Sequence, residues 1–459
     1  MKKKCKKGES QGLTLLLCAG FVLLLAARVW AATEVTCYVD PDASGANDGT
    51  SWADAYTSLA TAESNDFNAT SSDLVTNDEW VNCLCRSSGG SADTSGVTID
   101  GFTTDADNYI KISVPEAYRH DGIAGSGYCI EPSVAAHGIY TTEDYTRIIG
   151  IEVTNWSTDT TGSYDGINIA GTGCLVDSCL VHDSDHGAQS NSDAGGIQVD
   201  MSGITGTVRN SVVYNVARWG IGIHNADDSV LDVENCTVYN CVMADNSGNS
   251  YGCIGIYSSP GADLNAVNTI AAQAQSGDDF QNVADEGSSN NISEDATAPG
   301  STSQTNVVPA DLDFTNTTSG SEDLHIGLDS VAQDAGTDLS GTFTDDIDGD
   351  SRPAGTDWDI GADEKVSELI WDGTGNWTTA ANWNADSGYP ARGDTAYFDG
   401  TSSNNCTVDS PLTVAELELA DTYSGTVTLG ANLTVSNNLT IGTAATVSVG
   451  SYRLKLGGN

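Results

Sequence analysis

The feature that most constrains this chain of 459 residues is a phrase that recurs between residues 138 and 275. Its copies read VDSCLVHD (176–183), VRNSVVYN (208–215) and VENCTVYN (233–240), and each follows a shorter phrase, GINI (166–169), GIQV (196–199) or GIGI (220–223). Equivalent phrases lie 24 to 33 residues apart, an interval typical of structural repeats. The chain is too long for one ordinary compact domain, but stacked repeats can carry such a length as one unit.

Both phrases alternate apolar and polar residues over four or five positions, which predicts short β-strands with one buried face. We therefore expect a chain wound into a coil, in which each strand pairs with its equivalent one turn later. One column of residues should stack inside: Val181, Val213 and Val238. Polar ladders should form at two turns, the first from Ser178, Asn210 and Asn235, the second from Asp183, Asn215 and Asn240.

This rung pattern resembles the right-handed parallel β-helix of pectate-lyase-like and related extracellular proteins. The resemblance implies an all-β solenoid with three faces per turn. It places the G-I-x-I phrases on one face and the longer phrases on the other two. We assign residues 32–366 to this β-helix and its N-terminal cap.

The open N-terminal end of such a coil needs a cap. The stretch SWADAYTSLATA predicts a capping helix with Ser51 as its N-cap and with Trp52, Ala55, Tyr56 and Leu59 on its buried face. The longer phrase YVDPDASGANDGTSWADAYTSL (38–59) resembles the start of many secreted bacterial β-helix proteins.

Residues 1–31 combine lysines, an apolar run and an A-x-A-like site, as in a secretory signal peptide, and we expect cleavage after Ala31 or Ala32. The mature chain then has 11 basic and 63 acidic residues. This charge excludes broad affinity for nucleic acid or anionic membranes, and it disfavours an anionic polysaccharide unless divalent cations bridge the two. No later segment is apolar enough to span a membrane.

Two segments follow the repeats. DIDGDSRPAGTDWDIGADE (346–364) resembles the closing segment of bacterial β-helix proteins with a choice-of-anchor-type C-terminus. Its Asp346, Asp348 and Asp350 suggest calcium, but Gly349 falls one place too early for an EF-hand loop, so we favour a turn. Residues 367–459 predict a smaller β-rich module like those of large bacterial surface proteins. Such modules usually continue for more repeats, so a truncated C-terminus is one expectation.

Ten cysteines remain in the mature chain. In the repeat alignment Cys179, Ser211 and Cys236 occupy one inward column, which places the two cysteines two turns apart, roughly 9 to 10 Å. A disulfide cannot bridge that distance. We expect a buried ladder of small residues, and no C-x2-C pair is present to favour zinc.

The loops around the G-I-x-I strands supply the richest cluster of polar side chains. Because turns of the coil stack at about 4.8 Å, residues far apart in sequence would line one side of it. Aromatic rings beside carboxylates and amides suit a sugar-binding groove. The predicted substrate-binding residues are Tyr164, Asn168, Gln198, Trp219, His224 and Tyr251.

Two cleavage reactions fit this cluster. A lyase needs an acidic or calcium site and a base, and a hydrolase needs two carboxylates beside the bond, for which Asp183, Asp185 and Asp200 are candidates. The predicted catalytic residues are Asp185, His186, Asp200 and Arg218, and the predicted calcium ligands are Asp185, Asp193 and Asp200. The same residue types also recur at β-helix turns without any chemistry, because they satisfy backbone groups there.

The favoured interpretation is a protein that is secreted or held at the bacterial cell surface and that binds polysaccharide or another surface glycan, or mediates adhesion. The alternative is a polysaccharide lyase or glycoside hydrolase that acts in a groove beside the G-I-x-I strands. Calcium is the only cofactor that the sequence suggests.

Overall fold

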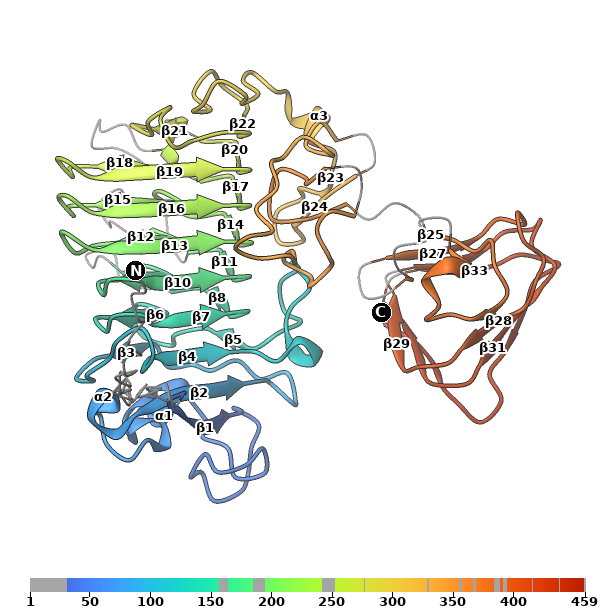
Figure 1. The fold of residues 1–459 in the computed structure, drawn as a ribbon, viewed down its shortest axis with the longest axis horizontal. Coiled ribbons are helices and arrows are strands. Elements are labelled where there is room, and N and C mark those ends of the chain that lie inside the picture. Colours follow the sequence, from blue (N-terminus) through green and yellow to red (C-terminus); the bar gives the residue numbers. More distant parts are fainter. Residues whose placement is uncertain are drawn as a thin grey trace, which may run out of the picture. The chain divides into compact units, whose positions relative to one another are not determined.

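The chain from Thr33 to Ser293 is wound into a coil of parallel strands, as Figure 1 shows. The structure is a computed structural model. It describes residues 31–459 except 157–163, 185–194, 242–251, 276, 328–329, 355–356, 366–368, 384–388, 391–393, 415, 437 and 458–459. The first 30 residues, which hold nearly all of the predicted signal peptide, lie outside this range.

Three parallel sheets form the sides of the coil, and from β4 onward each turn passes through them in the order I, II, III. Sheet I contains β1 (Thr33–Val39), β2 (Glu79–Cys85), β4 (Ile110–Ser113), β7 (Arg147–Ile149), β10 (Cys174–Asp177), β13 (Thr205–Arg209), β16 (Val230–Glu234) and β19 (Asp263–Val267). Sheet II contains β5 (Cys129–Ile130), β8 (Glu152–Thr154), β11 (Leu180–His182), β14 (Val212–Tyr214), β17 (Thr237–Tyr239), β20 (Ile270–Ala272) and β22 (Ile292–Ser293). Sheet III contains β3 (Val97–Ile99), β6 (Ile139–Thr141), β9 (Ile167–Ile169), β12 (Ile197–Val199), β15 (Ile221–His224), β18 (Gly252–Tyr257) and β21 (Asp278–Gln281). This is the right-handed parallel β-helix that the repeat predicts.

The strand register stacks equivalent residues of successive turns. Val181 pairs with Val213, which pairs with Val238, and all three are completely buried. The predicted valine column is therefore confirmed. Because side chains alternate along a strand, the residues on either side of each valine point outward.

The corner between sheets I and II is made by residues with left-handed backbone. Ser178, Asn210 and Asn235 have φ between 45° and 50°, and Asn268 continues the column at 51°. Asparagine adopts this conformation more readily than most residues, because its short amide can hydrogen-bond locally. The second predicted ladder, at the corner after sheet II, also has positive φ: Asp183, Asn215 and Asn240.

The inward column beside the first corner consists of small residues, as predicted. The backbone N–H of Cys179 donates to Oγ of Ser211 at 3.1 Å, so these residues lie on adjacent turns and Cys236 lies one turn further. The ten cysteines beyond residue 31 are all described, and all are free thiols.

The N-terminal mouth of the coil is closed by a plug of two short helices, α1 (Leu59–Glu63) and α2 (Leu74–Asn77). Leu59, Ala62, Phe67 and Leu74 are completely buried in the core at this end. The predicted cap is therefore present. Its buried residues extend further along the chain than the sequence suggests.

The start of the capping helix was predicted wrongly. The N-cap is Ser58, whose Oγ accepts the N–H of Thr61 at 3.1 Å, and not Ser51. Ser51 instead exchanges hydrogen bonds with Asp54 in a turn, and Tyr56 forms a parallel bridge to Val39. These contacts hold residues 51–57 in a non-helical path, so Trp52 lies against Tyr38, with ring centroids 4.9 Å apart, and not on a buried helix face.

Sheet II is covered on its outer face, which corrects the expectation of one buried face per strand. β11, β14 and β20 are buried at all three positions, a pattern typical of strands with layers on both sides. The outer layer is residues 309–365, called the strap below, which contain α3 (Pro309–Leu312) and the hairpin β23 (Phe314–Asn316) and β24 (Asp323–Ile326). Leu324 and Ile347 of the strap pack with Leu180 and Val212 of sheet II.

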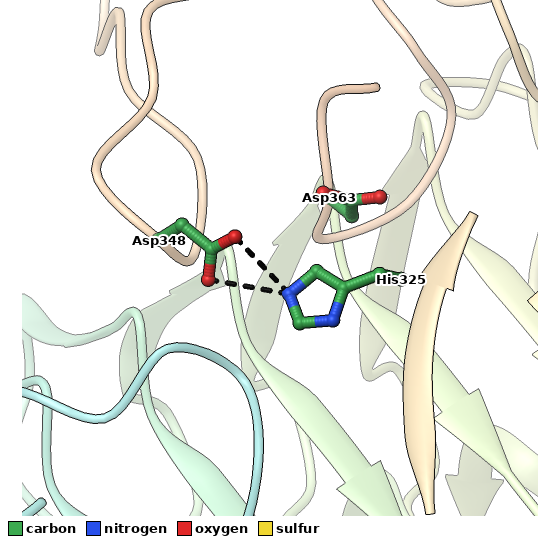
Figure 2. Close-up of side chains that lie close together, drawn as sticks. All are labelled: His325, Asp348 and Asp363. Atoms are coloured by element: carbon green, nitrogen blue, oxygen red, sulfur yellow. Dashed lines mark hydrogen bonds and ion pairs between the residues drawn. The ribbon is translucent and has the colours of Figure 1, made fainter. Parts of the chain in front are cut away.

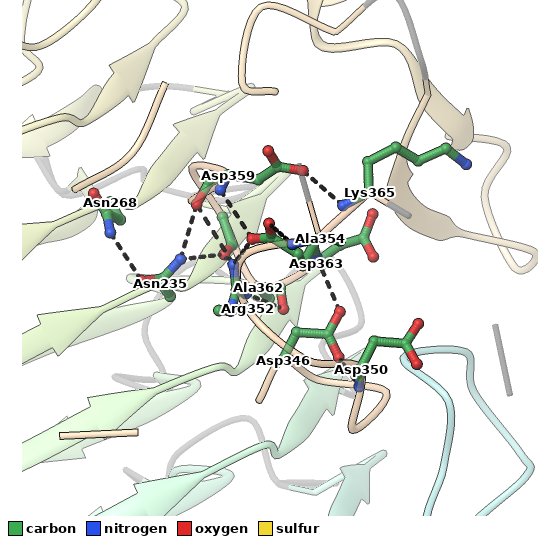
Figure 3. A network of polar contacts seen from close by, with 12 residues as sticks. Asn235, Asn268, Asp346, Asp350, Arg352, Ala354, Asp359, Ala362, Asp363 and Lys365 are labelled. Atoms are coloured by element: carbon green, nitrogen blue, oxygen red, sulfur yellow. Dashed lines mark hydrogen bonds and ion pairs between the residues drawn. The ribbon is translucent and has the colours of Figure 1, made fainter. Parts of the chain in front are cut away.

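The asparagines of the first corner hold the strap, and Figure 3 shows the contacts of Asn235. Nδ2 of Asn235 donates to the carbonyl oxygens of Asp359 and Gly361, both at 3.0 Å. Nδ2 of Asn268 donates to the carbonyl of Thr337 at 2.8 Å and also to Oδ1 of Asn235 at 3.0 Å. Buried carbonyl groups require such donors. The corner therefore fixes the path of the strap.

Arg352 fastens the strap from within. Its Nη1 donates to Oε2 of Glu364 at 2.9 Å, and its Nη2 donates to the carbonyls of Gly361 and Ala362. The side chains of Arg352 and Glu364 are both completely buried. Each charge therefore depends on the other, since a lone buried charge is strongly unfavourable.

Residues from Leu369 to Leu456 form a second, smaller set of parallel sheets, which agrees with the predicted β-rich module. The first contains β25 (Leu369–Ile370), β27 (Thr395–Phe398), β30 (Glu416–Leu419) and β33 (Leu439–Ile441). The second contains β26 (Gly375–Asn376), β28 (Cys406–Val408), β31 (Thr426–Leu429) and β34 (Thr446–Ser448), and the third β29 (Leu412–Val414), β32 (Leu433–Val435) and β35 (Leu454–Leu456). Trp371, Trp377 and Trp383 are completely buried in its core.

The remaining helical segments are also short. They are the 3-10 turns η1 (Asp66–Asn68), η2 (Glu116–Tyr118) and η3 (Ala380–Asn382). Among the residues that the structure describes, no helix has the length and apolar character needed to cross a membrane.

The substitution Arg352→Met is expected to destabilise the strap by about 3 to 5 kcal/mol, because Glu364 would remain buried without its cation. Limited proteolysis followed by mass spectrometry should then detect cuts within residues 309–365 before any cut in the coil. Arg453→Met, at an exposed position of the second module, is the control. Equal resistance of the strap in wild type and Arg352→Met would contradict this account.

Candidate functional site

The outer face of sheet III presents the middle residue of each G-I-x-I phrase. The residues on either side of each middle residue point into the core, so Tyr140, Asn168 and Gln198 form an outward column in strand register. Tyr140 is half-buried, whereas Asn168 and Gln198 are covered and only 1% and 3% exposed. Gly222 and Gly255 continue it on the next two turns. Two of the predicted substrate-binding residues, Asn168 and Gln198, are thus direct neighbours.

An aromatic cluster lies beside Gln198 and Gly222 of this column. Nε1 of Trp219 donates to Oε1 of Gln198 at 3.0 Å. The Trp219 ring lies 4.5 Å from the ring of His224, and Tyr257 lies 5.3 Å from His224, all measured between centroids. Trp219 is only 3% exposed, whereas Tyr257 is half-buried at the rim. The structure therefore brings Gln198, Trp219 and His224 together.

Tyr257 was missed by the sequence interpretation, which selected Tyr251. Tyr257 is the register partner of His224, directly after the fourth G-I-x-I phrase, CIGI (253–256). Aligning the residue that follows each phrase would have found it. Tyr251 lies outside the described residues.

A second aromatic cluster lies beside Tyr140 and Asn168, on the earlier turns of the column. The ring of His137 lies 5.2 Å from that of Tyr140 and 5.4 Å from that of Tyr164. Nδ1 of His137 accepts the N–H of Asp165 at 2.9 Å, and burial lowers the pKa of His137 to about 4, so its ring is neutral at neutral pH. The Asp165 carboxylate in turn accepts Nδ2 of Asn168 at 2.7 Å, which links this cluster to the amide column.

Asp200, directly after β12, is an exposed carboxyl group of this face. Partial removal from water by the surrounding chain raises its pKa, and the influence of His224 and a hydrogen bond from Asn168 oppose the rise. A carboxyl group with a raised pKa can hold or deliver a proton closer to neutral pH than a free aspartate. Asp200, His224 and Asn168 therefore form the polar end of the face.

The described part of the structure does not bring the other predicted catalytic residues and calcium ligands to this face. Arg218 is only 3% exposed, so a substrate would not reach it without rearrangement. Asp183 lies at the corner after sheet II, where it contacts His182 and Asn215. The remaining predicted residues lie outside the described residues: Asp185, His186 and Asp193.

Sheet II carries a buried imidazole that sequence reasoning missed. Nε2 of His182 lies 3.0 Å from Oε1 of Glu152, and its Nδ1 lies 2.9 Å from Oδ2 of Asp183. Burial opposes a charge on His182, but the hydrogen bonds to Asp183 and Glu152 outweigh it and raise the pKa to about 9. The ring also stacks on Tyr214 at 5.0 Å. His182 is the last residue of β11. Its burial depends on the layer outside sheet II, which the sequence did not predict.

The strap contains a second histidine between carboxylates, shown in Figure 2. Nε2 of His325 lies 3.1 Å from Oδ2 of Asp348, with the carboxylate of Asp363 nearby, and Nδ1 lies 2.5 Å from Oδ1 of Asp323. Burial opposes the charge, but Asp348 and Asp363 raise the pKa of His325 well above its usual value. The arrangement holds this part of the strap together by charge.

Two groups of strap residues have their ligand atoms within 4.8 Å of one another and could hold a cation: Asp346, Asp348 and Asp350, and His325, Asp348 and Asp363. Asp346 already accepts the backbone N–H groups of Asp348, Asp350 and Glu364, as a turn requires. Burial and the Asp346 charge raise the pKa of Asp350 to about 10. The geometry thus agrees with the turn that the sequence favours.

Comparisons with known proteins add little. No protein-family model matches the sequence, and no curated protein matches it. Among solved structures, the pectate lyase Pel9A is similar, at 15% identity and a TM-score of 0.37, over 72% of this chain and 97% of that chain. The β-helix architecture of the present chain follows from its own strand register.

Replacement of His182 by Gln should remove a pH-dependent contribution to stability. The pKa of His182 in the folded chain, about 9, lies above the value of about 6.5 in an unfolded chain. The contribution, on the order of 3 kcal/mol, is therefore complete below pH 6.5 and is lost as the pH rises through 9. The difference in unfolding free energy between wild type and His182→Gln should be large at pH 6 and small at pH 10.

The matched control is His137→Gln, because the folded pKa of His137 is lowered and not raised. The His137→Gln variant should still lose stability as the pH rises to 10, as the wild type does. Denaturant titrations at both pH values measure the difference. A constant difference between wild type and His182→Gln from pH 6 to pH 10 would contradict the ion pairs assigned to His182.

Proposed function

We propose that this protein is secreted, acts at the bacterial cell surface, and binds a neutral polysaccharide along the outer face of sheet III. One observation carries the proposal. Two aromatic clusters, around Trp219 and around His137, stand on the same face and are joined by the amides of Asn168 and Gln198.

Carbohydrate recognition requires flat apolar rings for the faces of the sugars and polar groups for their hydroxyls. At the surface beside sheet III, the half-buried rings of Tyr140, Tyr164 and Tyr257 and the exposed carboxyl group of Asp200 offer both. Asn168 and Gln198, at 1% and 3% exposure, hold these groups in place from beneath. Consecutive turns are spaced by about 4.8 Å, so a polysaccharide lying parallel to the coil axis would pass these groups one after another. Tyr164 and Tyr257, the half-buried members, are the rings that it would reach first.

The charge of the chain narrows the choice of ligand at this face. The formal net charge is −47, and Asp200 is an exposed carboxyl group here. An acidic glycan would be repelled by both. Sheet II is not available to a ligand because the strap covers it.

Tyr257→Ala and Tyr164→Ala should each weaken binding about fivefold, the effect of losing roughly 1 kcal/mol of ring contact. Isothermal titration with soluble glucan, mannan, xylan and galactan identifies the ligand and measures the change. Tyr452→Ala, which removes an exposed tyrosine from the second module, is the control. Absence of binding to every polymer, or binding that neither variant weakens, would overturn the proposal.

Asp200 gives a reason to test cleavage in the same samples. A lyase would produce unsaturated ends, and a hydrolase would produce new reducing ends. Product that disappears in Asp200→Asn would make the protein an enzyme, and loss of product with EDTA would support the proposed calcium site that includes Asp200. Binding without product would leave recognition as the function.

A further inference from the structure

The outer face of sheet I carries a small aromatic and basic patch that the proposed function does not use. In β2 the residues Val81 and Cys83 are buried in the core, so Trp80 and Asn82 point outward. In strand register Asn82 pairs with Lys111, and Lys111 pairs with Arg147. We call Trp80, Tyr109, Lys111 and Arg147 the basic patch. All four side chains are half-buried and reach solvent.

The rings of the basic patch are arranged as a platform. The centroids of Trp80 and Tyr109 lie 5.3 Å apart, with an angle of 31° between the ring planes. The guanidinium carbon of Arg147 lies 3.7 Å from the centroid of the Tyr109 ring. Such a contact orients a guanidinium group flat against the ring and leaves its N–H donors at the edge.

Two cations side by side on adjacent strands are unexpected in this chain. Like charges opposite each other on neighbouring strands repel and destabilise the pair. In the part of the chain that the structure describes, Lys111 and Arg147 have no ion-pair partner, whereas Arg86, Arg209 and Arg352 each have a carboxylate. The mature chain has 63 acidic residues that could have supplied one.

The acidic residue on the first strand of this face does not neutralise the patch. The carboxylate of Glu34 accepts hydrogen bonds from Nδ2 of Asn82 at 2.6 Å and from Oγ1 of Thr36 at 3.3 Å. Glu34 lies on β1, beside Trp80 in strand register and two strands away from Lys111. The patch keeps two positive charges next to two aromatic rings.

We propose that the basic patch is a second glycan-binding surface, which takes an acidic sugar of a polysaccharide. The carboxylate or sulfate of the sugar would lie between Lys111 and Arg147, and the sugar ring would lie against Trp80 and Tyr109. Both anions accept charge-assisted hydrogen bonds from lysine and arginine. The bound anion would also remove the repulsion between the two cations.

A broad polyanion does not fit this surface. Nucleic acid and anionic membranes need an extended basic area, and the rest of the chain is strongly acidic. At about 0.15 M salt, charges are screened over about 8 Å, so a single acidic group can be attracted locally while distant carboxylates are screened. The patch therefore suits isolated acidic sugars within a longer chain.

The test is the double variant Lys111→Gln/Arg147→Gln, compared with Arg453→Gln/Lys455→Gln. The control variant changes the net charge equally, at exposed positions of β35 in the second module. Binding is measured by titration with polymer pairs that differ only in sparse acidic groups: polygalacturonate with only a few free carboxylates and its full methyl ester for carboxylate, sparsely sulfated dextran and dextran for sulfate.

The proposal predicts that the wild type binds at least one acidic polymer at least tenfold more tightly than its neutral counterpart. The double variant should lose this preference, and the control variant should keep it. Which acidic polymer shows the preference distinguishes carboxylate from sulfate. The thermal midpoint of the free double variant should equal or exceed that of the wild type, because the repulsion is removed.

Three results would overturn the proposal. They are no preference for either acidic polymer in the wild type, an unchanged preference in the double variant, or equal loss in the control variant. The inference does not depend on sheet III, since binding of neutral polymers and its loss in Tyr257→Ala report on that face separately. The proposal for either surface can be disproved without affecting the proposal for the other.

Discussion

The side-chain amides at the corner between sheets I and II are the interaction on which the rest of the structure depends. Asn235 and Asn268 adopt a left-handed backbone that turns the chain from one sheet to the next. Their Nδ2 groups then donate outward to carbonyl groups of the strap. One column of residues therefore both turns the coil and binds the layer that covers sheet II.

This arrangement divides the surface of the coil into faces with different uses. The strap covers the outer side of sheet II, where Leu324 and Ile347 pack on Leu180 and Val212. His182 is buried on the same sheet as a charged group. Sheet I and the margin of sheet III keep half-buried or exposed side chains for contact with other molecules. Their chemistry differs, since sheet III has the rings of Tyr164 and Tyr257 and the carboxyl group of Asp200 at its margin, whereas sheet I presents Lys111 and Arg147. A protein with both faces could bind a polysaccharide that contains neutral and acidic sugars.

The sequence predicts the features that recur in every turn of the coil, but it does not predict those that occur only once. The valine column and both polar corners were predictable because each turn restates them. The covered face of sheet II was not predicted, although Leu180 and Val212, apolar residues at outward positions, carried the signal. The helix does not start at Ser51, because Tyr56 is held in a parallel bridge to Val39, a contact between distant residues that no local pattern reveals. Gln198, Trp219 and His224 could be grouped from the rungs alone, while Tyr257 needed the register.

Hydrogen–deuterium exchange of the mature chain, read by mass spectrometry, tests the central claim that the corner asparagines clamp the strap onto sheet II. Peptides from the strap should exchange as slowly as those from β11, β14 and β17, and in Asn235→Ala strap peptides should exchange faster while sheet I stays protected. Strap peptides that exchange within seconds in the wild type, beside a protected sheet II, would show that the strap is not part of the fold.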